Sequence, residues 1–198
     1  MSFRIATVLV MKKKTLVGKD KEKSMDIDKL ANILGKIKDL KRQGWVRREV
    51  TNPESVADHS FGVALLALIL CPKELDKQKC LEFAIIHDLA EIITGDITPG
   101  DKIPADIKYA KEAAAIKQIS EELEAPEIEQ LFLEFEKQDT PEAKFIKKMD
   151  RLDLIATAKY YTDNNRTTFF EEKDIGFDSL YHEFYSNHKE FLASIIEK

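Results

Sequence analysis

Residues 83–91 of the chain read FAIIHDLAE, a run in which apolar residues surround the adjacent pair His87 and Asp88. The chain holds four histidines, and a second one, His59 in PESVADHS, also follows an aspartate and leads into apolar sequence. Burying an imidazole or a carboxylate in apolar surroundings is costly unless a partner compensates it. A divalent cation would compensate them together, because neutral imidazole nitrogens and carboxylate oxygens are its usual protein ligands.

Glu91 and Asp150 extend this group of metal-ligand-type residues. On a helix, Glu91 would share a face with His87 and Asp88, because it follows them by four and three positions. Neighbouring positions diverge by roughly 100° around a helix, so one ion could contact both His87 and Asp88 only from a cleft beside the helix. Ligands from other helices would complete such a site, and His59 and Asp150 fall on two of the expected helices.

Each of these residues also has an ordinary structural interpretation. His59 alone could be a hydrogen-bonded histidine at a helix start, although the repeated pairing of histidine with aspartate favours a ligand. Asp150 could form a salt bridge with Lys147 or Arg151. Asp153 lies on the same face and could orient or pair with such a base.

Composition and periodicity indicate an all-α, single-domain protein. A length of 198 residues suits one domain with its own core. Glycine (7) and proline (6) are scarce, and apolar residues recur at helical spacing. Gly44 and Gly95 are expected to end helices, and Asp76, Pro126 and Thr140 to begin them. The predicted helices span about 27–43, 54–70, 76–93, 106–124, 127–137, 140–162 and 178–197.

Residues 1–24 differ from the remainder and predict a mobile N-terminal leader, with a short strand at 5–10 and the folded domain at 25–198. The leader is apolar and then basic, which is the reverse of the order in a secretory signal. No apolar run approaches the length needed to span a membrane. We therefore predict a cytoplasmic protein without membrane contact, in which Cys71 and Cys80 are reduced thiols.

The charge balance limits the class of partner. A net charge of −5 argues against duplex nucleic acid, which requires a basic face. A small phosphorylated ligand needs only a local basic pocket, and Arg47 and Arg48 in GWVRREV precede His59. Arginine forks suit phosphate oxygens, although both arginines could be solvated and Trp45 could simply cap the core.

Asp96 and the two remaining histidines give weaker signals. Asp96 follows Gly95 directly, so its carboxylate could project over a pocket mouth or simply form a turn. His182 and His188 have no metal-ligand-type companions and are expected at the surface.

The order H…HD…D is similar to that of the HD-domain metal-dependent phosphohydrolases. Within that order, GWVRREVTNPESVADHS (44–60) followed by HDLAEIITGDITP (87–99) closely resembles the 5′-deoxyribonucleotidase branch of the family. The resemblance covers about residues 27–165. The complete set of motifs, with its spacing, is far more specific than the HD pair alone.

The resemblance implies a helical bundle that binds one divalent cation, with Mn²⁺, Co²⁺ or Mg²⁺ as the expected ions. Its implied ligands are His59, His87, Asp88 and Asp150.

The resemblance also implies roles around the cation. Glu91 would assist catalysis, Asp96 would contact the sugar, and Trp45 would help to form the nucleotide pocket. Bacterial members have an arginine directly before this tryptophan, where the chain has Gly44. Arg48 matches an arginine of eukaryotic members and becomes the expected phosphate ligand in preference to Arg47, with Lys147 as a weaker candidate.

These observations predict a cytoplasmic, homodimeric phosphomonoesterase that hydrolyses deoxyribonucleoside 5′-monophosphates to deoxynucleoside and phosphate. Two alternatives remain open at this point. The chain could be an HD-type phosphodiesterase acting on cyclic or dinucleotide substrates, or a catalytically silent helical interaction module.

Overall fold

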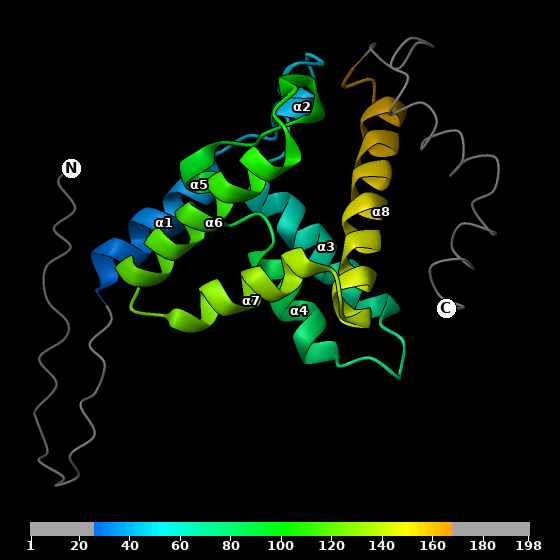
Figure 1. Ribbon diagram of the computed structural model, residues 1–198. Helices are drawn as coiled ribbons and strands as arrows, with labels where there is room; N and C mark the ends of the chain where they lie inside the picture. Colours follow the sequence, from blue (N-terminus) through cyan, green and yellow to red (C-terminus); the bar gives the residue numbers. More distant parts are fainter. Residues whose placement is uncertain (1–25, 168–198) are drawn as a thin grey trace, which may run out of the picture.

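The computed structural model describes residues 26–167, and this part of the chain is a bundle of helices (Figure 1). No strand forms within these residues apart from an isolated antiparallel bridge between Lys41 and Ser55. The predicted all-α fold is therefore confirmed. The elements are α1 (Ile27–Asp39), α2 (Gln43–Val46), α3 (Val56–Leu70), α4 (Lys77–Ile86), α5 (Glu91–Thr94), the 3₁₀ helix η1 (Pro99–Asp101), α6 (Ala105–Glu122), α7 (Pro126–Lys137) and α8 (Pro141–Asp163).

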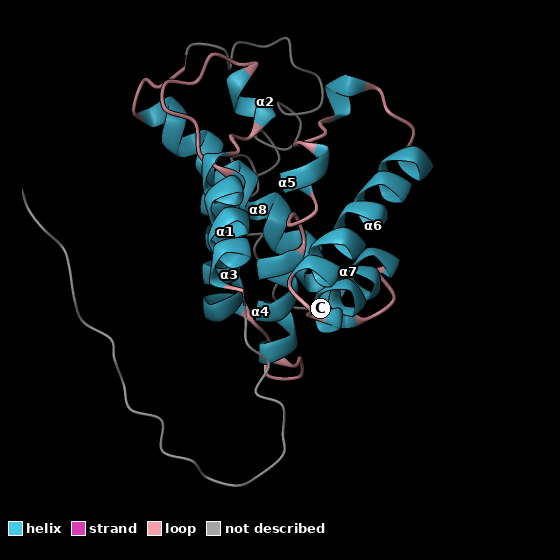
Figure 2. Ribbon diagram, turned by 90° about the vertical axis from the view of Figure 1, so that its left-hand side faces the viewer, coloured by secondary structure: helices cyan, strands magenta, loops and turns pink. Residues whose placement is uncertain are grey.

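Helix α3 lies at the centre of the packing, against α1, α4 and α8. Helices α6 and α7 pack against each other, and α7 closes the core over α4, as the two ribbon views show (Figure 2). Large apolar side chains fill the interior, among them Phe83, Ile116, Phe132, Ile146 and Met149. Removing such side chains from water is the main favourable contribution to the fold.

Helix starts follow the sequence signals. The Asp76 carboxylate accepts hydrogen bonds from the main chain of Gln78 and Lys79, and Thr140 caps α8 through the amide of Ala143. Pro126 occupies the first turn of α7, where its missing N–H costs nothing. Three predicted helix starts are thus confirmed. So is the predicted inward face of α8, whose buried residues include Phe145, Ile146, Met149, Leu152 and Ile155.

The first predicted helix ends earlier than expected, and Gly44 does not end it. Helix α1 stops at Asp39, the next residue Leu40 is extended, and Gly44 lies inside α2. The cause is a main-chain pairing with the segment before α3. The Leu40 carbonyl accepts from the Val56 amide at 2.9 Å, and the Arg42 amide donates to the Glu54 carbonyl at 3.1 Å.

The helix predicted for residues 76–93 is divided in two by a turn that carries the HD pair. His87 still donates its amide to the Phe83 carbonyl at 3.0 Å, as in an α-helix. The following amides of Leu89 and Glu91 reach back only three residues, to Ile86 and Asp88. This tightening separates α4 from α5 and changes the direction of Glu91 relative to His87. Gly95 ends α5 with a positive φ of 76°, as expected.

Several predictions concern other parts of the chain. The leader at 1–24 with its strand at 5–10, the helix at 178–197, and His182 and His188 lie outside the described residues. Among residues 26–167, none of the helices combines the length and apolar character that crossing a membrane requires.

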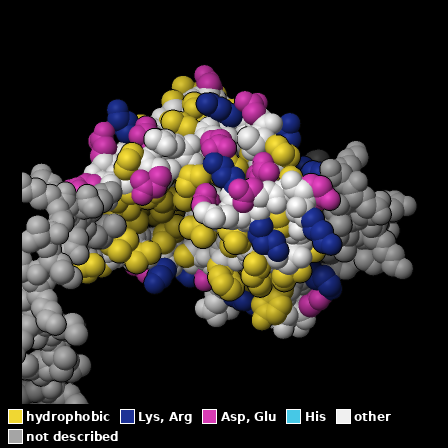
Figure 3. Space-filling view, turned by 90° about the horizontal axis from the view of Figure 1, so that it is seen from below, with side chains coloured by type: hydrophobic (Ala, Val, Ile, Leu, Met, Phe, Trp, Pro, Cys, Tyr) yellow, Lys and Arg dark blue, Asp and Glu magenta, His cyan; other side chains and the backbone are white. Residues whose placement is uncertain are grey.

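The surface of the described residues includes apolar areas. Figure 3 shows apolar side chains gathered on the face seen from below, with charged side chains between them. Helix α3 also exposes large apolar side chains, namely Phe61, Leu65, Leu68 and Ile69. Exposed apolar groups on one helix are typical of a surface that contacts another chain or segment.

Candidate metal centre and active site

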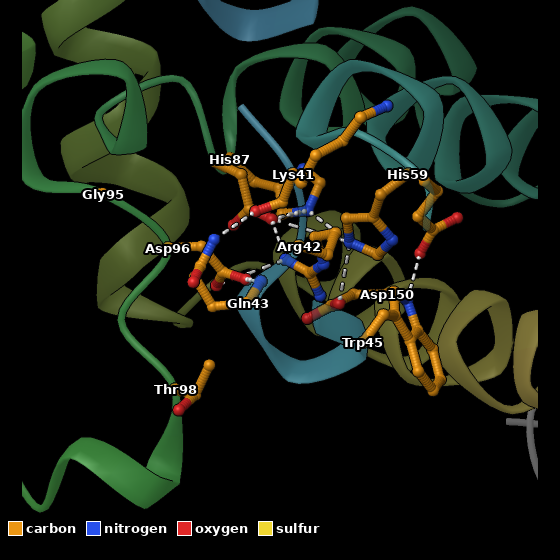
Figure 4. A network of polar contacts seen from close by, with 12 residues as sticks. Lys41, Arg42, Gln43, Trp45, His59, His87, Gly95, Asp96, Thr98 and Asp150 are labelled. Carbon is orange, nitrogen blue, oxygen red and sulfur yellow. Dashed lines mark hydrogen bonds and ion pairs between the residues drawn. The ribbon is translucent and has the colours of Figure 1, made fainter. Parts of the chain in front are cut away.

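Four side chains that are far apart in the sequence converge on one point. His59 comes from α3, His87 and Asp88 from the turn after α4, and Asp150 from α8 (Figure 4). His59 Nε2 lies 3.3 Å from His87 Nε2, 3.3 Å from Asp150 Oδ1 and 3.6 Å from Asp88 Oδ2. His87 Nε2 lies 3.4 Å from the same Asp88 oxygen. The structure therefore brings together all four residues that the sequence suggested as ligands.

The orientation of both imidazoles fits a cation at this point. His87 Nδ1 donates to the Ala84 carbonyl at 2.9 Å, so its Nε2 carries a lone pair toward His59. His59 Nδ1 is engaged by Asp153 Oδ2 at 2.8 Å, so its Nε2 also faces inward. Two lone pairs would repel each other at 3.3 Å unless a positive charge lies between them. Two imidazole nitrogens and two carboxylate oxygens are suitable ligands for a divalent ion.

The electrostatics of the four residues point the same way. Burial lowers the pKa of His59, but hydrogen bonds with Asp150 and Asp153 raise it by more, to about 9. Without an ion, His59 thus holds a proton where a cation would otherwise lie. Burial would raise the pKa of Asp150 and Asp88, but the neighbouring imidazoles outweigh it and lower both, helped by Lys147 at Asp150.

Arg42 is the site residue that the sequence reasoning missed. Its Nη1 lies 2.9 Å from Asp88 Oδ2 and 3.9 Å from Asp96 Oδ1. Figure 4 shows its side chain between Asp96 on one side and His59 and Asp150 on the other. A signal was present, since Arg42 lies in KRQGW next to the Gly44–Trp45 motif. The expected helix through residue 43 gave no reason to direct this side chain toward the ligands.

The two arginines that the sequence favoured lie elsewhere. Arg47 donates to Thr98 Oγ1 and to Asp101 Oδ1, both at 2.6 Å, and so ties α2 to the loop around η1. Arg48 Nη1 donates to the Gly44 carbonyl at 3.0 Å within its own segment. These hydrogen bonds of Arg47 and Arg48 lead away from the four converging side chains.

Asp96 lies on the rim of the site and is joined to α2. Its Oδ2 accepts from the Gln43 amide at 2.5 Å, so its position is fixed by the main chain on the opposite side. The loop that follows Gly95 carries Asp96 and Thr98 past the end of α5, as Figure 4 shows. The segment 41–43 and this loop thus form two sides of one opening.

Glu91 is buried, with 3% of its surface exposed, near the same carboxylates. Its Oε2 is one of the buried side-chain atoms within residues 26–167 that have no hydrogen-bond partner. Burial and the charges of Asp88 and Asp96 raise the pKa of Glu91 to about 10. A carboxyl group with such a shift beside a set of metal-ligand-type residues is a candidate for proton transfer.

Lys147 is close to the ligands, whereas Trp45 lies behind them. Lys147 Nζ lies 2.9 Å from Asp150 Oδ2, the oxygen that does not face His59. Trp45 is 2% exposed and donates its indole N–H to Glu54 Oε1 at 2.8 Å. Its ring packs edge-on against Tyr161, with centroids 5.3 Å apart. Trp45 therefore supports the wall that α2 forms.

The profile of the HD domain matches residues 34–192. The chain belongs to the HD domain family. The match accounts for the position of the His87–Asp88 pair at the convergence point. The metal dependence of the family agrees with the cation-compatible geometry of His59 and its neighbours.

Comparisons with individual proteins agree with this assignment. The human protein named 5′-deoxynucleotidase HDDC2 is 40% identical over 134 residues, which are 66% of this chain and 66% of that protein. The protein named 5′-deoxynucleotidase hdd1 from Schizosaccharomyces pombe is 36% identical over 160 residues, or 77% of this chain and 79% of its own length. The crystal structure of PH0347 from Pyrococcus horikoshii superposes with a TM-score of 0.67 at 32% identity, covering 86% of this chain and 94% of that one.

Proposed function

We propose that the protein is a metal-dependent phosphomonoesterase that hydrolyses deoxyribonucleoside 5′-monophosphates to deoxynucleoside and phosphate. The observation that carries the proposal is the convergence of His59, His87, Asp88 and Asp150 beside Arg42. Such a site offers ligands for a cation and a guanidinium for a phosphate in one place. Relatives named 5′-deoxynucleotidases, at 36% and 40% identity, support the choice of substrate.

The cation would be one divalent ion, with Mn²⁺, Co²⁺ or Mg²⁺ as the expected species, held by His59, His87, Asp88 and Asp150. When bound, such an ion supplies Lewis-acid polarisation of a phosphate oxygen and makes water more acidic. Asp88 would hold both the ion and Arg42, because the Arg42 guanidinium already donates to Asp88 Oδ2 at 2.9 Å. The ion and the guanidinium would then act on the same phosphate group.

Glu91 would move the proton. Its buried carboxyl group accepts the proton of the attacking water and returns it to the 5′-oxygen that leaves with the sugar. The O–P bond to the attacking oxygen forms as the bond to the leaving oxygen breaks. The raised pKa of Glu91, about 10 without an ion, suits a group that holds a proton during turnover. Positive charge at the ion site would favour its ionised form before the reaction.

The phosphate would be held chiefly by Arg42. Sequence reasoning assigned this role to Arg48, with Lys147 as the weaker candidate. The contacts of Arg42 with Asp88 and Asp96 make it the stronger candidate, since its guanidinium faces the ion site and the rim together. Lys147, at 2.9 Å from Asp150, remains a second cation near the phosphate. Arg48 would act farther out, through the turn at Gly44.

The nucleoside would lie between α2 and the loop after α5. The Asp96 carboxylate, as an acceptor, would bind the 3′-hydroxyl of the sugar and leave little room for a 2′-hydroxyl. Trp45 would contribute by supporting α2 from behind rather than by direct stacking, because its ring is buried. These two residues would complete the nucleotide pocket.

We also propose a setting for the enzyme. The protein would act in the cytoplasm as a homodimer, without duplex nucleic acid as a partner, and residues 1–24 would form a leader separate from the catalytic domain. The exposed apolar side chains of α3 support a contact between copies. The net charge of −5 supports the exclusion of duplex nucleic acid.

A nucleotide panel tests the proposal. The purified protein is stripped of metal, and single divalent ions are added back before phosphate release is measured for each substrate. We expect release from dAMP, dGMP, dCMP or dTMP only when an ion is present. Hydrolysis of cyclic or dinucleotides instead would show a phosphodiesterase, and tight ion binding without any hydrolysis would show a silent interaction module.

A further inference from the structure

The two converging histidines are held by different kinds of acceptor. His87 Nδ1 donates to the Ala84 carbonyl of its own helix at 2.9 Å. His59 Nδ1 instead lies 2.8 Å from Asp153 Oδ2, so a side chain of α8 holds an imidazole of α3. His59 is fully buried, and Asp153 is 8% exposed. The orientation of His59 therefore depends on a contact between two helices.

Gly62 provides the space in which the Asp153 carboxylate lies. A Cβ atom added at Gly62 would be 2.0 Å from Asp153 Oδ1 and 2.8 Å from its Cγ, far inside any allowed contact. Gly62 lies within α3 without a positive φ, so its backbone conformation does not require glycine. Glycine inside a helix is also unfavourable relative to alanine. The space for a carboxylate is thus the physical feature that glycine provides here.

We propose that Asp153, seated in the space left by Gly62, is a positioning residue for His59. This inference rests on the proposed role of His59 as an ion ligand. Asp153 accepts the Nδ1 proton, which fixes the tautomer and directs the Nε2 lone pair at the ion site. Without this acceptor, a buried N–H would lack a partner and the ring would lose its preferred orientation.

The placement of Asp153 on α8 links it to a second ligand. Asp150 precedes it by three positions, so the two carboxylates share one face of the same helix. One carboxylate reaches His59 Nε2 and the other reaches His59 Nδ1, at 3.3 Å and 2.8 Å. Helix α8 therefore supplies both an ion ligand and the group that orients another ligand.

Substitution of Asp153 tests the proposal through metal affinity. Co²⁺ affinity is measured by competition with a chelating dye, and the visible absorption of bound Co²⁺ reports the ligand geometry. We expect Asp153→Ala to weaken Co²⁺ binding by roughly 10- to 100-fold, the usual effect of removing a group that orients a metal ligand. Asp153→Asn keeps an oxygen acceptor, so it should restore part of the affinity. If Asp153→Ala does not fold, Asp153→Asn and the glycine variants carry the test.

Glycine variants test the role of the space. Gly62→Ala should displace the carboxylate and weaken Co²⁺ binding to a similar extent. In the Asp153→Ala background the added methyl group meets no carboxylate, so Gly62→Ala should cause no further loss. Gly35→Ala is the matched control, because Gly35 is also inside a helix but a Cβ there meets nothing within 4 Å. The control should bind Co²⁺ as the wild type does.

The outcomes separate this inference from the proposed function. Wild-type Co²⁺ affinity and an unchanged Co²⁺ spectrum in Asp153→Ala would overturn it, as would equal losses from Gly62→Ala with and without Asp153. Nucleotide hydrolysis plays no part in these measurements. A wild type that binds Co²⁺ but hydrolyses no nucleotide would reject the phosphomonoesterase and leave the role of Asp153 intact.

Discussion

His59 Nε2 and His87 Nε2 lie 3.3 Å apart, although 28 positions separate these residues in the chain. Each ring has its other nitrogen occupied, by Asp153 and by the Ala84 carbonyl. Such a pair is stable only with a proton or a cation between the two nitrogens. Both the ligands and the groups around them can therefore be tested by substitution and by changes of pH.

Removal of any one ligand should remove the ion. His59→Ala, His87→Ala, Asp88→Ala and Asp150→Ala should each lose bound metal and activity, because each takes one of the four converging atoms away. Metal content by elemental analysis, after dialysis against a single divalent ion, checks this. A variant with full metal content and full activity would remove that residue from the ligand set.

The ion-free protein should lose stability as the pH rises from about 6.5 to about 9. The pKa of His59 rises from 6.5 to about 9 on folding, and that of Glu91 from 4.5 to about 10. Both groups bind protons more tightly in the folded chain, so their contribution is present at low pH and is lost as the pH rises through the folded values. Burial lowers the pKa of His87, an opposite effect that is complete by its ordinary value of 6.5.

Thermal unfolding of the ion-free protein across this pH range measures the effect. Addition of the ion should raise Tm by an increasing amount as the pH rises, because the ion replaces the proton on His59. A Tm of the ion-free protein that climbs between pH 6.5 and 9 would contradict the assignment. The His59→Gln variant provides the control, since it lacks the main group that titrates in this window.

Glu91→Gln should separate ion binding from chemistry. Glutamine resembles the protonated form that burial favours in the ion-free protein, so the variant should fold and retain the ion. It cannot accept a proton, and turnover should fall by a typical general-base factor of roughly 10² to 10⁴. Steady-state kinetics combined with metal analysis test this. Near-normal turnover with a full complement of metal would exclude Glu91 from the mechanism.

Arg42→Ala should weaken nucleotide binding more than Arg48→Ala does. Loss of a charge-assisted contact costs about 1.5–3 kcal/mol, or about tenfold or more in affinity. Arg48 is the matched control, since it carries the same charge and donates to Gly44 instead. Because Arg42 also contacts Asp88, metal content is measured in both variants. A larger loss in Arg48→Ala at equal metal content would return the phosphate to the residue that the sequence first suggested.

Asp96→Ala should reduce the preference for deoxyribose. The carboxylate is fixed by the Gln43 amide, so it has a defined position from which to exclude a 2′-hydroxyl. Asp96→Asn keeps an oxygen for that amide and should preserve the loop while losing the charge. Comparison of dAMP with AMP in the wild type and both variants tests this. An unchanged ratio of the two rates in Asp96→Ala would leave Asp96 as a turn residue.

The sequence predicted the helices and the ligand set because both depend on local patterns. Apolar periodicity marked the inward face of α8, and a histidine beside an aspartate within apolar sequence marked the turn after α4. The capping residues Asp76 and Thr140 act on amides two or three positions away, so their effect can be read directly from the chain.

What the sequence did not predict depends on contacts between distant segments. The break after Asp39 results from main-chain bonds to the segment before α3, and it brings Arg42 to the site. Nothing local to Arg42 indicates this, and a helical period through residue 43 predicts otherwise. The role of Gly62 is equally non-local, because the atoms that exclude a methyl group there belong to Asp153 on another helix.

The origin of the four ligands in separate segments gives the bound ion a topological role. An ion held by α3, the turn after α4, and α8 would act as a reversible cross-link that closes long loops of the chain. Separation of α8 from its neighbours would then require the ion to leave first. The rate of unfolding in excess chelator would approach the rate of ion release, so resistance to unfolding would become a kinetic property of the loaded protein.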